Sequence, residues 1–319
     1  MRLRARHGLA LWVAVALLSS CSVKKYAIGK VGDALAAPGP SVYETDDDIE
    51  LVGGALPFSL KFVESLLVEA PYHRGLLLTA CRGFTLYAYA YVDFEAEKTI
   101  EKDLAQGRKM RERAKRLYLR AFDYGVRAIE TRHPGFGDAL RRTPTEAVAV
   151  FEPKRAVREI PLIYWTASSL GLAIGLAKDD AAMLARIPEV EALIERAVEL
   201  DPDWEDGSLD EYQVTFASAK PGGGDPEIVR NHYDRALRLS GGKRGGLFVA
   251  FAEAFAEPEQ DHRLFRQMME RAQAIDVDAV PRYRLVNSLA KRRAEWLSGR
   301  IDELFLIQDE TSEPQGENP

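Results

Sequence analysis

Apolar residues that recur every three or four positions, in segments closed by proline or glycine, constrain the fold of this chain most. One such stripe closes at Ala70-Pro71 and a second follows it; their members are Leu56, Leu60, Val63, Leu66 and Leu67, then Leu76, Ala80, Phe84, Tyr87 and Tyr91. Strands need a sustained two-residue alternation between turns, and we find none. The sequence therefore predicts an all-α protein, with a helical hairpin over residues 56–95 and one long helix from about 103 to 132.

The C-terminal half contains an internal repeat of helix ends. Alanines precede three of these ends, at Ala197, Ala236 and Ala272. A small residue lets two helices approach closely, and the proline or glycine that follows turns the chain. The pattern resembles the tetratricopeptide repeat, a helix pair of about 34 residues. We therefore expect helical-hairpin repeats stacked in a superhelix, whose concave face is a binding scaffold; a generic helical bundle is the alternative.

In the last of these units, Val249, Ala252 and Ala256 should lie on the first helix. Phe265, Met269 and Ala272 should lie on the second. Earlier units are more degenerate, with extra residues between the matching positions.

The N-terminus reads as a lipoprotein signal peptide. Three arginines precede an apolar run from Leu9 to Leu18, which is short for a membrane span, and Ser19-Ser20-Cys21 follows it. Small residues before the cysteine suit cleavage, which would leave Cys21 as a lipidated N-terminus. A plain secretory signal or an uncleaved anchor helix is the alternative. Removing residues 1–20 takes away three arginines and no acid, so the formal charge falls from −6 to −9.

This acidic balance argues against nucleic acid as a partner, because phosphate-binding proteins show a basic face. With Cys21 acylated, Cys81 is the one remaining thiol, so no intramolecular disulfide can form. We divide the chain into a signal peptide (1–20), a lipidated N-terminus and tether (21–47), a helical repeat domain (48–308) and a disordered tail (309–319). Within the tether, Ala36 to Asp47 should be partly extended.

The chain shows no pattern typical of an enzyme, and we predict no catalytic residue, metal or cofactor. The four histidines beyond the signal, His73, His133, His232 and His262, have no partner at metal-ligand spacing. Cys81 lies on an apolar stripe, which indicates a buried structural thiol. The glycine-rich segments lack the preceding strand of a phosphate-binding loop. An enzyme with paired carboxylates in a groove is the remaining alternative of that class.

Basic and aromatic residues supply the candidate binding features. Six basic residues between Arg108 and Arg116 on the long helix suit a solvated face, or else an acidic partner. Aromatic residues concentrate in two helices, and we predict that Phe84, Tyr87, Tyr91, Tyr164 and Trp165 line an apolar ligand groove; the alternative is that they belong to the core.

Several short segments, in order along the mature chain, carry a more specific resemblance. They are Lys30 to Ala36, Asp46 to Asp48, Glu50 to Val52, Ala55 to Phe58, His73 to Leu78, His133 to Phe136, Tyr164 to Ala167, Lys178 to Asp180, Ile275 to Ala279 and Arg292 to Leu297. Over about residues 21–307, the chain resembles the lipoprotein T component of tripartite ATP-independent periplasmic (TRAP) transporters.

The resemblance implies a membrane-tethered, oligomeric helical protein that faces the periplasm and binds the transporter's substrate-binding protein. It also implies an apolar or organic-acid ligand, but fixes no side chain that contacts one. Ser22 after the lipid cysteine favours sorting to the outer membrane. A repeat lipoprotein that scaffolds outer-membrane assembly, or another envelope complex, is the alternative function.

Overall fold

The computed structural model describes residues 26–36, 39, 41–217 and 220–306. Every regular element within these residues is a helix, which confirms the predicted all-α class. The signal peptide, Cys21 and the tail at 309–319 lie outside the described residues. Contacts divide the chain into two compact units: Met1–Gly39 with Glu50–Pro202, and Pro40–Ile49 with Asp203–Pro319. They are called unit 1 and unit 2 below.

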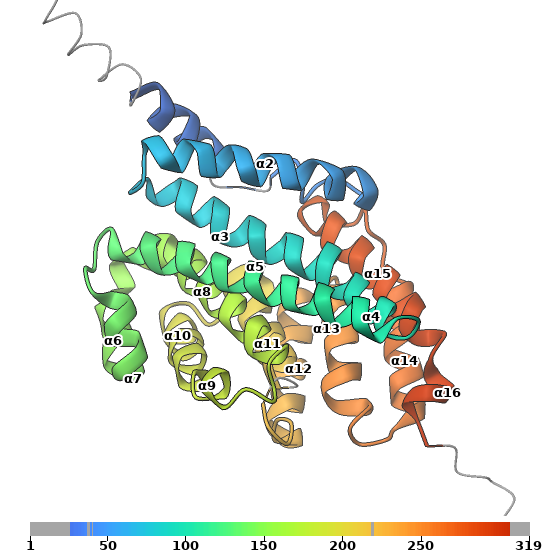
Figure 1. The fold of residues 1–319 in the computed structure, drawn as a ribbon. Coiled ribbons are helices and arrows are strands. Elements are labelled where there is room, and N and C mark those ends of the chain that lie inside the picture. Colours follow the sequence, from blue (N-terminus) through green and yellow to red (C-terminus); the bar gives the residue numbers. More distant parts are fainter. Residues whose placement is uncertain (1–25, 37–38, 40, 218–219, 307–319) are drawn as a thin grey trace, which may run out of the picture. The chain divides into compact units, whose positions relative to one another are not determined.

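The first half of unit 1 is built from long helices (Figure 1). Residues 26–35 are helical, and then come α2 (Ile49–Glu69), α3 (Arg74–Ala88), a π-helical turn η1 (Tyr89–Asp93), α4 (Phe94–Ile100) and α5 (Leu104–Glu130). The hairpin predicted at 56–95 and the long helix predicted at 103–132 are thus present, and both arms of the hairpin are longer than predicted. The His73 ring accepts a hydrogen bond from the backbone of Leu76, and Asp103 accepts one from Gln106, so each side chain caps a helix start.

The rest of unit 1 comprises α6 (Phe136–Arg142), α7 (Pro144–Ala147), η2 (Val148–Val150), η3 (Pro153–Arg155), α8 (Ala156–Gly175), α9 (Ala181–Leu184) and α10 (Ile187–Leu200). The core forms where α5 packs between α3 and α8. At this crossing a Cβ on Gly125 would stand 2.2 Å from the Thr166 hydroxyl and 3.1 Å from the Cys81 sulfur. Glycine is needed there because the three helices leave no room for a side chain.

Unit 2 consists of α11 (Trp204–Ala217), α12 (Pro226–Ser240), α13 (Gly245–Phe251), a π-helical turn η4 (Ala252–Ala256), α14 (His262–Gln273), η5 (Pro281–Tyr283), α15 (Arg284–Ser298) and α16 (Ile301–Leu304). Helices α13, α14 and α15 pack on one another. The six residues predicted to lie on the two helices of the last unit are found on α13 with η4 and on α14, and all are buried in this core. That pair is therefore confirmed, and Ala197, Ala236 and Ala272 are buried near the ends of α10, α12 and α14.

Described residues of the segment predicted to be a tether make contacts in each unit. In unit 1, the helix at 26–35 meets the His73 ring, whose Nε2 lies 3.2 Å from the Gly29 carbonyl oxygen. In unit 2, the Glu44 carbonyl accepts a hydrogen bond from the Leu285 backbone, and the Thr45 carbonyl accepts one from Arg284. The partly extended conformation expected over Ala36 to Asp47 stays a prediction.

Candidate functional site

Three of the five predicted groove residues, Phe84, Tyr87 and Tyr91, lie on α3 and η1. Phe84 is buried and its ring stacks on Tyr124 of α5, with centroids 5.9 Å apart. The rings of Tyr87 and Tyr91 also stack, at 5.9 Å. The Arg113 guanidinium of α5 donates to the Tyr87 hydroxyl at 3.3 Å and lies 5.7 Å from that ring's centroid. This side of α3 thus combines aromatic surface with cations.

Tyr91 owes its position to a close approach between α2 and η1. A Cβ on Gly53 of α2 would lie 2.5 Å from the Tyr91 ring, so glycine leaves the space that the ring fills. The π-helical turn that carries Tyr91 is also tied to α5, because the Tyr118 hydroxyl donates to Asp93 at 3.0 Å. Turns of this kind occur often at functional sites.

The other two predicted residues lie on α8. Tyr164 and Trp165 are half-buried, and their rings meet edge to face at a centroid distance of 5.1 Å. The guanidinium of Arg82 on α3 lies 5.7 Å from the Trp165 centroid. The structure therefore places the five aromatic residues in two groups, one on α3 and η1 and one that includes Tyr164 and Trp165, where α3 meets α8. Whether either group binds a ligand stays a prediction.

Cys81 has the character of a core residue. It is fully buried, and burial raises the pKa of its thiol to about 12, because the charged thiolate is disfavoured in the core. Hydrogen bonds from Ser169, Thr166 and the Gly125 backbone oppose this shift only in part. The predicted buried structural thiol is confirmed.

Two of the histidines, His73 and His232, serve as local hydrogen-bond partners. His73 caps α3, and Nδ1 of His232 lies 2.8 Å from a carboxylate oxygen of Asp210, which is buried in unit 2. Across the described ranges, no group of three His, Cys, Asp or Glu side chains is arranged to hold a metal ion.

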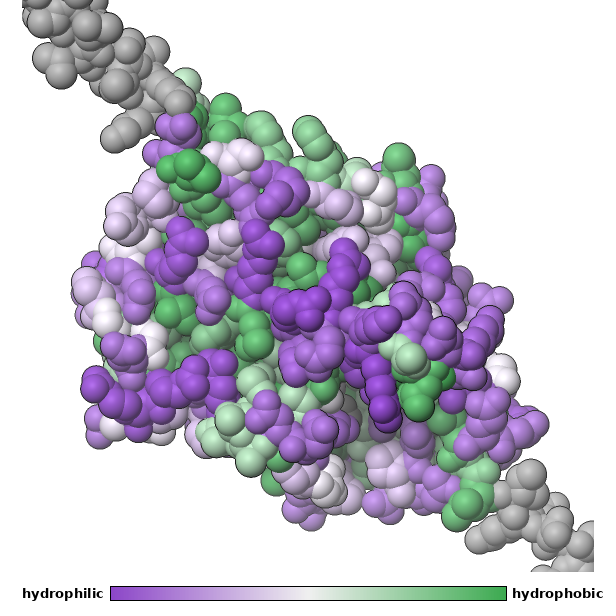
Figure 2. Space-filling view, in the orientation of Figure 1, coloured by the Kyte–Doolittle hydropathy of each residue, from purple (hydrophilic) through white to green (hydrophobic). Residues whose placement is uncertain are grey.

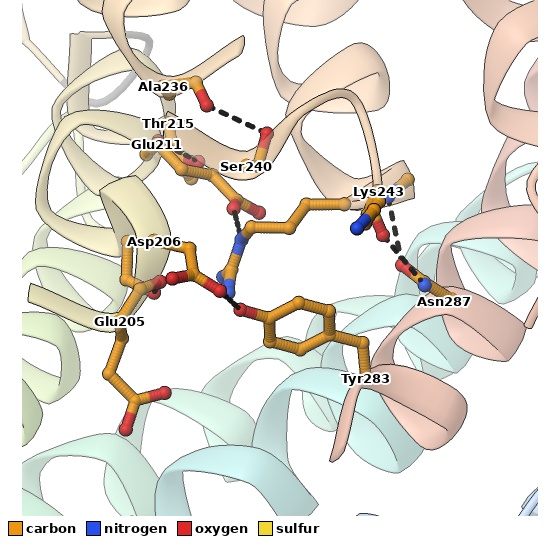
Figure 3. A network of polar contacts seen from close by, with 12 residues as sticks. Glu205, Asp206, Glu211, Thr215, Ala236, Ser240, Lys243, Tyr283 and Asn287 are labelled. Atoms are coloured by element: carbon orange, nitrogen blue, oxygen red, sulfur yellow. Dashed lines mark hydrogen bonds and ion pairs between the residues drawn. The ribbon is translucent and has the colours of Figure 1, made fainter. Parts of the chain in front are cut away.

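A polar network in unit 2 was not predicted from the sequence (Figure 3). It is built on a left-handed turn in α11, where Glu205, Asp206 and Gly207 have φ values of 50°, 54° and 89°. Two of these residues are not glycine, and each costs about 1 kcal/mol in this conformation. A turn with this strain persists where its surroundings hold it.

Tyr283 and two arginines surround the strained turn and hold it in place. Figure 3 shows Tyr283 pointing at Asp206 while Glu205 points away, and the Tyr283 hydroxyl donates to the Asp206 carboxylate at 2.6 Å. Arg282 also donates to Asp206. The Arg244 guanidinium lies 4.9 Å from the Tyr283 centroid and donates to Glu211. The hydrogen bond from Tyr283 and the charge of Arg282 lower the pKa of Asp206, although partial burial opposes them.

Asn287 completes the network by fixing the loop before α13. Its side chain is buried; it accepts a hydrogen bond from the Gly245 backbone at 2.9 Å and donates to the Lys243 carbonyl at 3.0 Å. The network is internally paired, so its geometry suits the stabilisation of unit 2. An Asp-Gly pair signals a turn in sequence, but here it lies within a helical segment and was not recognised.

Comparison with known proteins adds what the geometry alone does not give. The model of the family described as "TRAP transporter T-component" matches residues 45–305. A Treponema pallidum (strain Nichols) protein, described as an uncharacterized protein, is 27% identical over 306 residues, which cover 91% of this chain and 94% of the relative. The match spans both units, and the chain belongs to the TRAP transporter T-component family.

Proposed function

We propose that this protein is a lipid-anchored, periplasm-facing accessory scaffold of a TRAP solute transporter and that it binds the transporter's substrate-binding protein. The observation that carries the proposal is the family match across residues 45–305. The helix pairs of both units, interpreted as degenerate tetratricopeptide-type units in a superhelix, support a scaffold role. Cys21 would be the lipidated residue, and several copies of the chain would assemble.

The exposed face of α5 is our candidate for the protein-binding surface. Lys109 and Arg116 are exposed on one side of this helix, together with Arg113, Arg120 and Arg127. Among the described residues, no ion pair is recorded for Lys109 or Arg116. Figure 2 shows the strongly hydrophilic surface that runs over α5. Lys109 and Arg116 therefore suit an acidic patch on another protein and would speed its association.

The test is capture from solubilised membranes with a C-terminal tag, with and without cross-linking. We expect recovery of a periplasmic substrate-binding protein of a TRAP transporter. The Lys109→Glu/Arg116→Glu variant should recover severalfold less of it. The matched control, Arg238→Glu/Arg263→Glu, changes the charge equally on exposed residues of unit 2. Capture of no such protein under cross-linking would contradict the proposal.

The apolar or organic-acid ligand is a further part of this proposal. The cluster of Tyr87, Tyr91 and Arg113 supports an organic acid, because a guanidinium can bind a carboxylate while the stacked rings contact an apolar part.

A further inference from the structure

Helix α2 exposes a long apolar face. Leu51, Phe58, Phe62 and Val68 are all exposed on it, and Phe58 reaches 76% exposure. Between Glu50 and Glu69, the one charged residue among the exposed positions is Lys61, which pairs with Glu64 at 2.6 Å. Figure 2 shows hydrophobic surface along α2. Apolar surface of this extent on a helix marks an interaction site.

The opposite face of α2 packs against the other helices of unit 1. Val52, Leu56, Leu60, Val63 and Leu67 are buried. Leu60 fills the space beside Gly83 of α3, and Glu64 accepts a hydrogen bond from Tyr124 and forms an ion pair with Arg120, both on α5. By length and composition α2 could cross a membrane, but crossing would break these contacts. The helix can offer its exposed side to a lipid surface while its inner side stays packed.

The apolar face continues toward the place where the N-terminal segment enters unit 1. Val68 and Tyr72, both about 80% exposed, stand at the end of α2 next to His73, which holds the helix at 26–35. Tyr26 is five positions after Cys21, so the intervening chain spans about 18 Å at most. An acyl chain on Cys21 would therefore hold a bilayer within reach of this end of α2.

We propose that the exposed face of α2 lies flat on the bilayer, with Phe58 and Phe62 inserted at the interface. Aromatic side chains on an apolar face, where Lys61 is the one exposed charged residue between Glu50 and Glu69, suit this position. Lys24, Lys25 and Lys30, close to Cys21 in sequence, suit the negative charge of lipid headgroups. The inference rests on the proposed lipid anchor for the location of the protein, but contact between α2 and lipid does not itself require acylation.

The test is co-sedimentation of purified chain beginning at residue 22 with vesicles of phosphatidylcholine and phosphatidylglycerol. This chain lacks the lipid and keeps every described residue. We expect measurable binding that falls roughly tenfold or more in Phe58→Gln/Phe62→Gln, because two aromatic rings no longer leave water. The matched control is Leu104→Gln/Ile228→Gln, which removes two exposed apolar side chains elsewhere and should bind as the unsubstituted chain does.

Helix content and melting temperature of each variant show whether it folds. Binding that is unchanged in Phe58→Gln/Phe62→Gln, or absent in the unsubstituted chain, would overturn the proposal. So would a soluble oligomer that this variant dissociates, because α2 would then be a subunit interface. The mass of the mature protein tests acylation of Cys21 separately, so failure of the anchor and failure of the α2 contact give different results.

Discussion

Glycine serves different needs at the crossing around Gly125 in unit 1 and at the turn around Gly207 in unit 2. Gly125 has ordinary helical geometry, and what excludes a side chain is the Thr166 hydroxyl 2.2 Å from the Cβ position. Gly207 has a φ of 89°, which side chains rarely tolerate, and its turn is held by charged and hydroxyl groups. The first position is governed by packing distance, and the second by backbone conformation and electrostatics.

The largest loss of stability is expected where α3, α5 and α8 cross at Gly125. Gly125→Ala should destabilise unit 1 by about 2–3 kcal/mol, because the new methyl group overlaps Thr166 and Cys81 in a packed core. Hydrogen exchange of α3, α5 and α8 measures this loss region by region, which suits a chain of two units. In protein that also carries Cys21→Ser, the buried Cys81 is the one thiol, and its faster alkylation would report the same local loss of stability.

Gly54→Ala is the matched control for that substitution. Gly54 is also inside a helix, but nothing lies within 4 Å of its Cβ position. Alanine there should stabilise α2 by up to about 1 kcal/mol, because it restricts the unfolded chain. If Gly125→Ala and Gly54→Ala changed the stability of unit 1 in the same direction, packing distance would not distinguish the two glycines.

A smaller loss is expected at the turn. Gly207→Ala should cost unit 2 about 1–2 kcal/mol, since an alanine is strained at this φ and its methyl group would lie 3.0 Å from the Ala236 Cα. Gly241→Ala is the comparison, because Gly241 also has a positive φ but open space around it. Urea unfolding of the two variants separates the cost of backbone strain from the cost of packing. An equal loss of stability in Gly207→Ala and Gly241→Ala would show that packing against α12 has no role.

The smallest effect is a dependence on pH that arises from the turn and not from the crossing. The pKa of Asp206 is lowered in the folded state, so its contribution is complete above the unfolded value of 3.8 and is lost as pH falls through the folded pKa. Asp206→Asn should cost unit 2 about 1 kcal/mol near neutral pH, a modest value because the carboxylate is 43% exposed.

Below the folded pKa of Asp206, this difference between the two proteins should vanish. The measurement is the urea midpoint of each protein over a series of pH values, with Gly207→Ala as a variant that keeps the carboxylate. A constant difference between the unsubstituted protein and Asp206→Asn at all pH values would show that Asp206 acts through geometry alone.

Much of the helical framework could be predicted from particular residues. Apolar spacing located α2, α3 and α5, and Pro71 and His133-Pro134-Gly135 marked where helices end. The buried alanines and the C-terminal helix pair followed from the same spacing. The aromatic residues were less predictable, because spacing places Tyr87 and Tyr91 on one face but does not show that Gly53 makes room for Tyr91 or that Arg82 approaches Trp165.

The sequence by itself determined the all-α class, the hairpin of α2 and α3, the long helix α5, the buried character of Cys81 and the family, because these depend on local periodicity and on ordered motifs. Only the tertiary structure decided that Gly125 is a crossing point, that Asp206 meets Tyr283, and that Phe58 and Phe62 of α2 are exposed. The physical reason is that such features depend on distances between segments far apart in the chain, which no local pattern encodes.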